Sequence, residues 1–318
     1  MSNPASVAVE APARLHFGVL DLRGRLGRCF VGLGAAIPSP SLSIEVAPSP
    51  RLTVEGPEAE RALEFARRFL ACYRLTSGAH LTVHRAIPAH SGLGSGTQLG
   101  LAVARALAQL HGISATVVDL AQATGRGKRS AIGTWAFALG GFIVEGGRRP
   151  ESSSIAPLLA RFAIPATWRY VLAVPSRCRG LSGEEETRAF QELPPPPDRE
   201  VEQVSHLVLM QLLPSLVEAD LPSFGDALSQ VQRITGGWFA AQQGGVFAPG
   251  PTEHLIARMA EWGADGVGQS SWGPAAYGLV ENAAAAAALA EQVRRFLGPD
   301  GEVFQGVFAP EGARVSTL

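Results

Sequence analysis

The stretch that decides the fold is Pro88-Ala89-His90-Ser91-Gly92-Leu93-Gly94-Ser95-Gly96-Thr97. It follows residues 81–87, which alternate like a β-strand, and it leads into residues 97–110, whose apolar positions have helical spacing. Glycines at such a junction allow positive φ angles and a close approach of the backbone to a ligand. The N–H groups of the first helical turn, with the helix dipole behind them, form an anion site. Hydroxyls from Ser95 and Thr97 can add donors.

Two interpretations of this loop are open from its chemistry alone. It either binds phosphate, or it is an ordinary Gly-Ser loop in which Ser95 or Thr97 caps the helix, because short glycine motifs recur by chance. The stretch is not a Walker A motif, since no lysine follows the second glycine. It is not a Rossmann fingerprint with a distant ribose-binding acid either.

The composition is typical of a folded protein whose net charge produces no strong overall electrostatic field. A chain of 318 residues suggests two domains, and 46% hydrophobic with 17% charged residues can fill a substantial core. The net charge of -1 excludes recruitment of nucleic acid or of an acidic membrane by overall charge. An anionic ligand must therefore be held by local groups. The three cysteines lie far apart with no CxxC spacing, as is typical of reduced thiols.

The sequence predicts a cytoplasmic protein. No apolar segment of the signal-peptide type stands near residue 1, and the longest apolar stretch, residues 283–290, is too short to span a membrane. We expect a homodimer, because this is the commonest assembly of soluble enzymes.

Periodicity predicts an α+β chain with a boundary where the pattern loosens, at residues 163–166. We therefore expect domains over residues 1–165 and 166–318. The predicted strands are 7–10, 41–46, 52–55, 81–87, 169–174, 276–281 and 303–308, and the predicted helices are 58–73, 97–110, 201–213, 253–262 and 283–297.

Two glycine-rich stretches resemble motifs of one superfamily. Pro88-x-x-x-Gly92-Leu93-Gly94-Ser95 resembles the central motif of the GHMP kinases, which wraps the phosphates of ATP. Gly268-Gln269-Ser270-Ser271-Trp272-Gly273-Pro274-Ala275 is similar to the third motif, which folds over the same pocket. This resemblance implies a two-domain fold, with an N-terminal half like ribosomal S5 domain 2 and a C-terminal half like a ferredoxin-like α/β sandwich.

The chain departs from the kinases at the phosphotransfer acid. Those kinases commonly carry a carboxylate in a stretch like Ser-Gly-x-Asp that ends in Gly-Gly, and the comparable stretch here is residues 130–141. By spacing, Gly133 stands where the carboxylate would be, and glycine can neither accept a proton nor orient a hydroxyl. The phosphate loop differs as well, since it continues Ser95-Gly96-Thr97-Gln98 rather than Ser-Ser-Ala.

Further stretches carry a nearer resemblance. They are residues 11–18 with Asp21-Leu22, residues 24–34, residues 140–147, residues 174–186 and residues 269–274. They are similar to the β-ribofuranosylaminobenzene 5'-phosphate synthase family, which opens methanopterin biosynthesis. The resemblance implies a phosphoribosyl transferase that joins phosphoribosyl pyrophosphate to para-aminobenzoate, or a close analogue, with loss of carbon dioxide and pyrophosphate.

Such a reaction needs a bound and neutralised pyrophosphate, a clamp for the sugar phosphate and an aromatic ring shielded from water. We assign the pyrophosphate to Gly92, Leu93, Gly94, Ser95, Gly96 and Thr97, with Mg²⁺ held mainly through its oxygens and no metal site built by the protein. The cationic candidates are Arg14, His16, Arg28, Lys128 and Arg129, the last two in a cluster with Arg126. A solvated loop tip is the alternative for that cluster.

Catalytic roles are expected for Arg14, His16 and Glu184. Arg179 and Ser182 can hold a carboxylate or phosphate, although a capped helix start explains Ser182 and the following glutamates equally well. The third glycine-rich stretch contributes Ser271 and Trp272, of which Trp272 either stacks on the aromatic substrate or fills the core.

Two other functions remain open from the sequence. An ATP-dependent small-molecule kinase would need a carboxylate at the position of Gly133. A non-catalytic phosphosugar-binding protein would bind phosphoribosyl pyrophosphate without consuming it. Nucleic-acid binding is disfavoured by the near-neutral charge.

Overall fold

Two β-sheets organise the chain, of which the computed structural model describes residues 6–149, 151, 154–176, 178–181 and 183–318. The first sheet has the order β11-β1-β2-β4-β3, and β5 and β6 extend it from the first part of β2. Its strands pair antiparallel except β3 with β4. They are β1 (Val7–Val19), β2 (Gly32–Ser49), β3 (Thr53–Glu55), β4 (Gly78–Arg85), β5 (Phe142–Glu145), β6 (Leu158–Phe162) and β11 (Arg314–Thr317).

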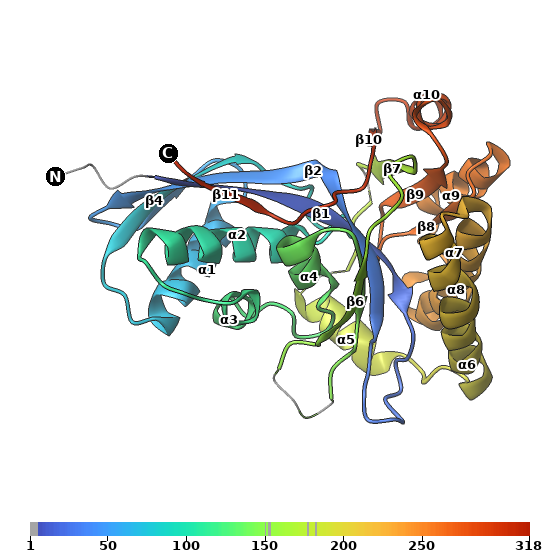
Figure 1. The fold of residues 1–318 in the computed structure, drawn as a ribbon, viewed down its shortest axis with the longest axis horizontal. Coiled ribbons are helices and arrows are strands. Elements are labelled where there is room, and N and C mark those ends of the chain that lie inside the picture. Colours follow the sequence, from blue (N-terminus) through green and yellow to red (C-terminus); the bar gives the residue numbers. More distant parts are fainter. Residues whose placement is uncertain (1–5, 150, 152–153, 177, 182) are drawn as a thin grey trace.

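Four helices lie on one side of the first sheet (Figure 1). They are α1 (Ala59–Cys72), α2 (Ser95–Leu110), α3 (Val117–Ala123) and α4 (Ile132–Leu139). Helix α2 contacts β1, β2 and the other three helices. It is apolar nearly all round, as expected of a helix enclosed by the core. This central position fixes the start of α2, where the glycine-rich loop ends.

The second sheet has the order β10-β7-β9-β8, with every pair antiparallel. Its strands are β7 (Arg169–Pro175), β8 (Gly266–Gln269), β9 (Ala276–Val280) and β10 (Gly301–Gly306). The accompanying helices are α5 (Gly183–Glu192), α6 (Asp198–Leu207), the π-helix η1 (Val208–Leu212), α7 (Leu213–Glu218), α8 (Leu221–Gln243), α9 (Pro251–Glu261) and α10 (Ala283–Leu297).

Strand β7 shows how the second sheet is buried on both faces. Val171 and Ala173 pack in a cluster with α9 and α10, whereas Tyr170 and Leu172 belong to the large cluster that also holds the first sheet. Alternate side chains of a strand point to opposite faces, so one strand serves both cores. Helix α8 contacts both β8 and β1 and thereby joins the two sheets.

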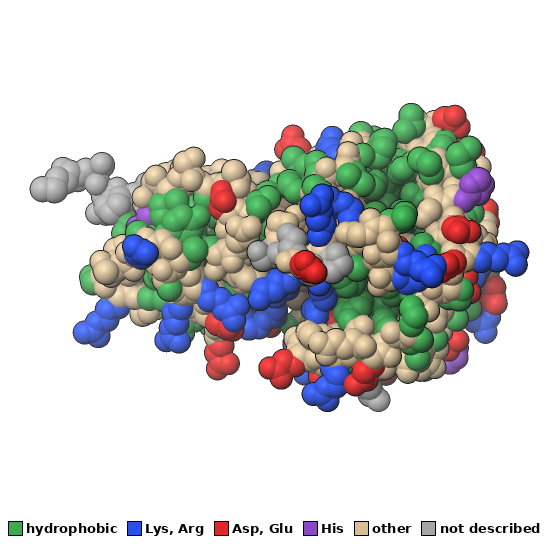
Figure 2. Space-filling view, turned by 90° about the horizontal axis from the view of Figure 1, so that it is seen from below, with side chains coloured by type: hydrophobic (Ala, Val, Ile, Leu, Met, Phe, Trp, Pro, Cys, Tyr) green, Lys and Arg blue, Asp and Glu red, His purple; other side chains and the backbone are tan. Residues whose placement is uncertain are grey.

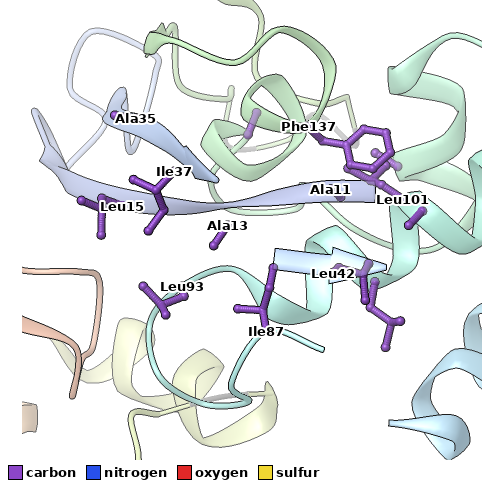
Figure 3. Packing of buried hydrophobic residues seen from close by; sticks show 14 of the residues in the cluster. Ala11, Ala13, Leu15, Ala35, Ile37, Leu42, Ile87, Leu93, Leu101 and Phe137 are labelled. Atoms are coloured by element: carbon purple, nitrogen blue, oxygen red, sulfur yellow. The ribbon is translucent and has the colours of Figure 1, made fainter. Parts of the chain in front are cut away.

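Leucine and alanine side chains fill the core beneath the glycine-rich loop. Figure 3 shows Leu93 of that loop beside Ile87, with Ala13 and Leu15 of β1 in the same cluster. Leu93 is 1% exposed. It therefore anchors the loop in the core, and the part it plays in ligand binding is limited to its backbone.

The α+β prediction is confirmed, but several predicted bounds are too short. The strand predicted at 7–10 runs to Val19, and the strand predicted at 41–46 begins at Gly32. Helix α8 was not predicted. The predicted division at 165 and 166 falls between β6 and β7 and stays a prediction, while β11 near the C-terminus pairs with β1. No helix in the described part of the chain is long and apolar enough to cross a bilayer.

The shared core predicts that the two sheets unfold together. Phe142 is fully buried and its ring lies 5.9 Å from Phe17 of β1 and 6.0 Å from Phe224 of α8. We expect Phe142→Ala to lower the free energy of unfolding by about 3–5 kcal/mol, because a cavity replaces the ring. Urea unfolding followed by tryptophan fluorescence and by circular dichroism measures this.

The exposed Leu159 of β6 offers a matched control. Leu159→Ala should change the free energy of unfolding by less than about 0.5 kcal/mol. Two separate transitions in Phe142→Ala, one for each sheet, would contradict a shared core.

Candidate active site

The start of α2 carries backbone donors that the helix does not use. The carbonyl of Gly94 accepts the N–H groups of Thr97 and Gln98, and the N–H groups of Ser95 and Gly96 precede them in the first turn, where a helix offers no acceptor. Gly94 has φ 79° and provides no side-chain cap, and the first turn holds no acidic residue. The helix end therefore favours an external anion.

The turn between β8 and β9 braces the glycine-rich loop. A Cβ at Gly92 would lie 2.0 Å from the carbonyl oxygen of Ser270, so only glycine fits there. The Ser270 hydroxyl donates to the Gly92 carbonyl over 2.7 Å, and the N–H of Ala275 donates to the carbonyl of Ser91 over 3.2 Å. The two glycine-rich stretches that the sequence singled out are thus in direct contact.

Arginines from three parts of the chain surround the start of α2. Arg14 of β1 donates to the Gly92 carbonyl, and Arg126 donates to the Thr97 hydroxyl over 3.2 Å. A Cβ at Gly96 would lie 2.5 Å from a guanidinium nitrogen of Arg61 and 3.5 Å from one of Arg126. Figure 2 shows Lys and Arg side chains gathered near the middle of the face seen from below. The chain therefore holds a local positive field in spite of its net charge of -1.

Burial and the repulsion between neighbouring cations lower the pKa of two of these arginines. Burial lowers the pKa of Arg14 to about 10, although the charge of Glu186 opposes this and that of Arg126 adds to it. The pKa of Arg126 is also lowered, first by burial and then by the charge of Arg61. With a pKa of about 10, Arg14 remains cationic at neutral pH. A bound anion would relieve the cost of holding them together.

Beside Glu58, which pairs with Arg61 over 2.6 Å, Glu186 of α5 is a carboxylate that borders this cluster. It forms an ion pair with Arg129 and receives a hydrogen bond from the Trp272 side chain. Burial raises its pKa, while Arg129 and then Arg14 oppose that shift. Glu184, which the sequence favoured, is exposed two residues earlier on the same helix. The catalytic role expected of Glu184 stays a prediction.

The other predicted residues of this region lie in different settings. Lys128 and Arg179 are exposed, and Ser271 is partly buried with its carbonyl accepting the Gln269 amide over 2.9 Å. Ser182 lies outside the described residues. The expected involvement of Lys128, Arg179, Ser182 and Ser271 in substrate binding stays a prediction.

Trp272 packs inside an aromatic group. Its ring lies 5.4 Å from Phe190 and 4.9 Å from Phe239, and only 6% of the residue is exposed. Phe190 is partly buried, with Arg129 5.5 Å above its ring and Phe30 5.4 Å away at its edge. Phe30, Phe190 and Phe239 are therefore more accessible than Trp272, and Phe190 is the one that lies beside Arg129.

Arg28 belongs to a separate group. It donates to the carbonyls of Gly146 and Gly147 over 3.2 and 3.1 Å. With Arg148 and Arg149 it lines a hollow of about 290 Å³. A phosphate clamped by Arg28, as the sequence predicts, would lie in that hollow.

His16, Ser130 and Glu145 form a polar group near Arg14, in which His16 and Glu145 are buried and Ser130 is partly exposed. His16 Nε2 lies 3.3 Å from the Ser130 hydroxyl, and the Gly18 N–H donates to His16 Nδ1 over 3.3 Å. Burial, helped by the charge of Arg14, lowers the pKa of His16 to about 3, so the ring is neutral. The Glu145 carboxylate accepts the N–H of Gly147 over 2.8 Å and that of Ala131 over 3.4 Å. A neutral His16 is unsuited to neutralising phosphate as a cation.

Several of these residues had no predicted role. Arg61, Ser130, Glu145, Glu186 and Ser270 were missed as site residues, and Arg126 was noticed only as part of a basic cluster. Each acts through a contact with a distant part of the chain, such as Ser270 with His16 and Gly92. A local sequence pattern carries no signal for such contacts.

Gly133, which the sequence aligned with the kinase carboxylate, lies beside the start of α2. It is buried on α4, its carbonyl accepts the Gln98 amide over 2.9 Å, and a Cβ there would lie 3.1 Å from the Thr97 side chain. The position therefore adjoins the first turn of α2, and it offers no carboxylate. Among the described residues, no three His, Cys, Asp or Glu side chains gather into a metal site. The expected Mg²⁺, held mainly by ligand oxygens, stays a prediction.

Comparison with known proteins first identifies the fold class of the chain. The family described as GHMP kinases N terminal domain matches residues 59–141. A mevalonate kinase from L. major superposes with a TM-score of 0.70 at 16% identity, over 95% of this chain and 96% of that one. Homoserine kinase from Cytophaga hutchinsonii superposes with a TM-score of 0.66 at 16% identity, over 98% and 97%. The chain has the two-domain α+β fold of the GHMP kinase superfamily, as predicted.

Sequence relatives define the family within that class. A β-ribofuranosylphenol 5'-phosphate synthase from Methanothermobacter thermautotrophicus is 37% identical over 294 residues, which is 86% of this chain and 88% of the relative. The protein of the same name from Archaeoglobus fulgidus is 36% identical over 286 residues, again 86% and 88%. The chain belongs to the β-ribofuranosylphenol 5'-phosphate synthase family.

The contact between Gly92 and Ser270 predicts a selective loss of anion binding. Gly92→Ala places a methyl group 2.0 Å from the Ser270 carbonyl at φ 78°, which must displace the loop. We expect the affinity for inorganic pyrophosphate, measured by calorimetry, to fall by at least about tenfold, because the loop amides lose their alignment with Arg14.

Gly112→Ala is the matched control, since Gly112 also has a positive φ (64°) but no atom within 4 Å of the added methyl. It should cost about 1 kcal/mol of stability and leave pyrophosphate affinity unchanged. Equal affinities in the two variants would show that the loop does not bind the anion.

Proposed function

We propose that this protein transfers the phosphoribosyl group of phosphoribosyl pyrophosphate to a para-substituted benzoate, with release of carbon dioxide and pyrophosphate. The observation that carries the proposal is the convergence of Arg14, Arg61 and Arg126 on the open N–H groups at the start of α2. Membership of the synthase family supports the same reaction. The product would enter methanopterin biosynthesis, as the family resemblance implies.

The reaction balances without a further reactant. The ring carbon that bears the carboxylate forms a bond to the anomeric carbon, and the bond from that carbon to pyrophosphate breaks with its electron pair on pyrophosphate. The ring–carboxylate bond then breaks, its electron pair restores the aromatic ring, and carbon dioxide leaves.

The residues at the start of α2 would stabilise the departing pyrophosphate. Negative charge grows on its bridging oxygen as the bond breaks, and the Ser95 and Gly96 N–H groups with Arg126 are fixed beforehand around that anion. Mg²⁺ would supply further charge neutralisation, bound mainly through pyrophosphate oxygens. Glu186, which pairs with Arg129 beside this cluster, would be available to share such an ion. The arginines need no rearrangement, because contacts with Gly92 and Thr97 already hold them.

The aromatic acid would lie against Phe190 and Phe30. These rings are partly buried, and Arg129 lies over Phe190 within reach of a carboxylate. The para group of the acid is either an amine, as the family resemblance implies, or a hydroxyl, as in the ribosylphenol of the relatives' names. Both groups donate electrons to the attacking ring carbon.

A small-molecule kinase is the second candidate, because the fold is shared with homoserine and mevalonate kinases. The absence of a carboxylate at Gly133, beside Thr97, weighs against it. We expect no phosphotransfer from ATP to an alcohol.

The proposed reaction is tested by incubating the protein with Mg²⁺, phosphoribosyl pyrophosphate and carboxyl-labelled para-aminobenzoate or para-hydroxybenzoate. Labelled carbon dioxide and pyrophosphate should appear in equal amounts with one or both acids. Conversion of ATP to ADP with an alcohol, and no carbon dioxide from either acid, would show that the protein is a small-molecule kinase instead.

The role of Arg126 can be tested separately. Arg126→Met keeps much of the buried stem but removes the charge, so we expect the KM for phosphoribosyl pyrophosphate to rise by about 10- to 100-fold. Steady-state kinetics measures this. Arg67→Met, which removes an exposed arginine of α1, should leave KM unchanged, and an unchanged KM in Arg126→Met would exclude the assigned role.

A further inference from the structure

Three arginines line the hollow of about 290 Å³ beside Gly147. Arg28 precedes β2 in the chain, and Arg148 and Arg149 follow β5. None of the three forms an ion pair with a carboxylate in the part of the chain that the structure describes. A group of like charges without a counter-charge favours the binding of an external anion.

Backbone pairing brings two of these arginines together. The N–H of Cys29 donates to the carbonyl of Arg148 over 2.9 Å, and the N–H of Arg148 donates to the carbonyl of Cys29 over 3.0 Å. A Cβ at Gly147 would lie 2.4 Å from the Cys29 carbonyl oxygen, and Gly147 has φ 62°, so this approach requires glycine. Because Arg28 adjoins Cys29 in the chain, the same pairing holds Arg28 near Arg148 before any ligand binds.

The guanidinium groups keep hydrogen-bond donors for a ligand. Arg28 uses one of its three nitrogens, Nη1, for the carbonyls of Gly146 and Gly147. The Nε of Arg148 is buried and has no acceptor among the described residues. A buried donor without an acceptor costs free energy, which a bound anion would recover. Arg149 is exposed, so an anion can reach the hollow from solvent.

Phe30 connects this hollow to the cations at the start of α2. Its ring lies 5.9 Å from the guanidinium carbon of Arg148 and 5.4 Å from the ring of Phe190. The guanidinium carbon of Arg129 lies 5.5 Å from the Phe190 ring, and Arg129 pairs with Glu186 at the border of the cluster. Two groups of cations are thus joined through two aromatic rings.

The backbone of Phe30 has a conformation that bulky residues rarely adopt. Its φ is 79°, in the left-handed region that favours glycine. The N–H of Phe30 donates to the carbonyl of Asp21 over 2.6 Å, which helps to hold this conformation. Residues held in such strained conformations are common at ligand sites. In this protein the conformation accompanies a ring that contacts both Arg148 and Phe190.

We propose that the hollow at Arg28, Arg148 and Arg149 binds the 5'-phosphate of phosphoribosyl pyrophosphate, while the start of α2 binds its pyrophosphate. The identity of this ligand rests on the proposed ribosyl transfer, whereas its chemistry, a phosphate monoester, rests on the arginines. Planar guanidinium groups match phosphate oxygens in paired hydrogen bonds. The substrate carries an anionic group at each end of its sugar, and the chain provides a group of cations for each. The sugar and the aromatic acid would meet at the Phe30–Phe190 pair.

The two halves of the substrate test the two sites separately. Calorimetry measures the affinities for ribose 5-phosphate and for inorganic pyrophosphate. Arg148→Met and Arg149→Met should each lower the affinity for ribose 5-phosphate by at least about tenfold and change that for pyrophosphate by less than about twofold. Arg126→Met should have the opposite effect. Arg149 is exposed, so Arg149→Met tests the site even where Arg148→Met disturbs the packing of Phe30.

Arg67→Met is the matched control, because Arg67 is an exposed arginine of α1. It should keep both wild-type affinities. A ribose 5-phosphate affinity that is unchanged in both hollow variants, or wild-type protein that does not bind ribose 5-phosphate, would overturn the site.

Inorganic phosphate distinguishes the 5'-phosphate of the substrate from a separate phosphate ion. Saturation with phosphoribosyl pyrophosphate should abolish the phosphate binding that depends on Arg149, because the substrate's own 5'-phosphate then fills the hollow. Phosphate binding that depends on Arg149 and persists under saturation would show that the hollow takes a free ion, and would overturn the assignment.

Kinetics separates this proposal from the ribosyl transfer itself. In the carbon dioxide assay, Arg149→Met should raise the KM for phosphoribosyl pyrophosphate by about tenfold and change kcat by less than about threefold, since the hollow binds the ground state and the transition state alike. Carbon dioxide release with an unchanged KM in Arg149→Met would refute the phosphate site alone. Ribose 5-phosphate binding that depends on Arg149, in a protein that releases no carbon dioxide, would refute the ribosyl transfer and leave a phosphate monoester site in place.

Discussion

The Ser270 hydroxyl holds together the elements on which the site depends. It donates to the Gly92 carbonyl over 2.7 Å and receives the backbone N–H of His16 over 2.9 Å. These bonds join β1 of the first sheet, the glycine-rich loop and the turn after β8 of the second sheet. Because Ser270 is fully buried, water cannot replace the bonds. The loop is thus fixed before any ligand arrives.

The electrostatics of the site follow from that fixed frame. Arg14 is aligned by the Gly92 carbonyl, Arg126 by Thr97 and Arg129 by Glu186. Burial, and to a smaller extent the neighbouring like charges, lowers the pKa of Arg14 and of Arg126. A protein keeps such an arrangement where function requires it. Here it gives a local concentration of positive charge in a nearly neutral chain.

The sequence identified those features that depend on local backbone chemistry. The glycine-rich loop and the turn at 268–275 were recognisable from residue spacing. So was Gly133, a glycine at the position where the kinase motif commonly has a carboxylate. Bounds were less predictable: Gly32 and Gly34 weaken the strand signal of β2, yet a Cβ at Gly34 would lie 2.5 Å from the Leu15 carbonyl. Close packing between strands requires these glycines, and a single-sequence pattern does not reveal it.

Side-chain roles were harder to predict because they depend on where helices and strands meet. Glu184 and Glu186 are indistinguishable in a first helical turn until the direction of α5 is known, and the structure turns Glu186 toward Arg129. Glu145 follows three apolar residues and looks like an ordinary strand end, although its carboxylate is fully buried and accepts the N–H of Ala131. The sequence left open whether Trp272 stacks on the substrate or fills the core, and in the structure its aromatic neighbours bury it.

The central claim is that a kinase fold here breaks a carbon–oxygen bond rather than a phosphorus–oxygen bond. Phosphoribosyl pyrophosphate carrying an isotopically labelled oxygen between the anomeric carbon and phosphorus distinguishes the two directly. After turnover with the aromatic acid, mass spectrometry should find the label entirely in the released pyrophosphate. Label retained on the sugar would show phosphoryl transfer and contradict the account.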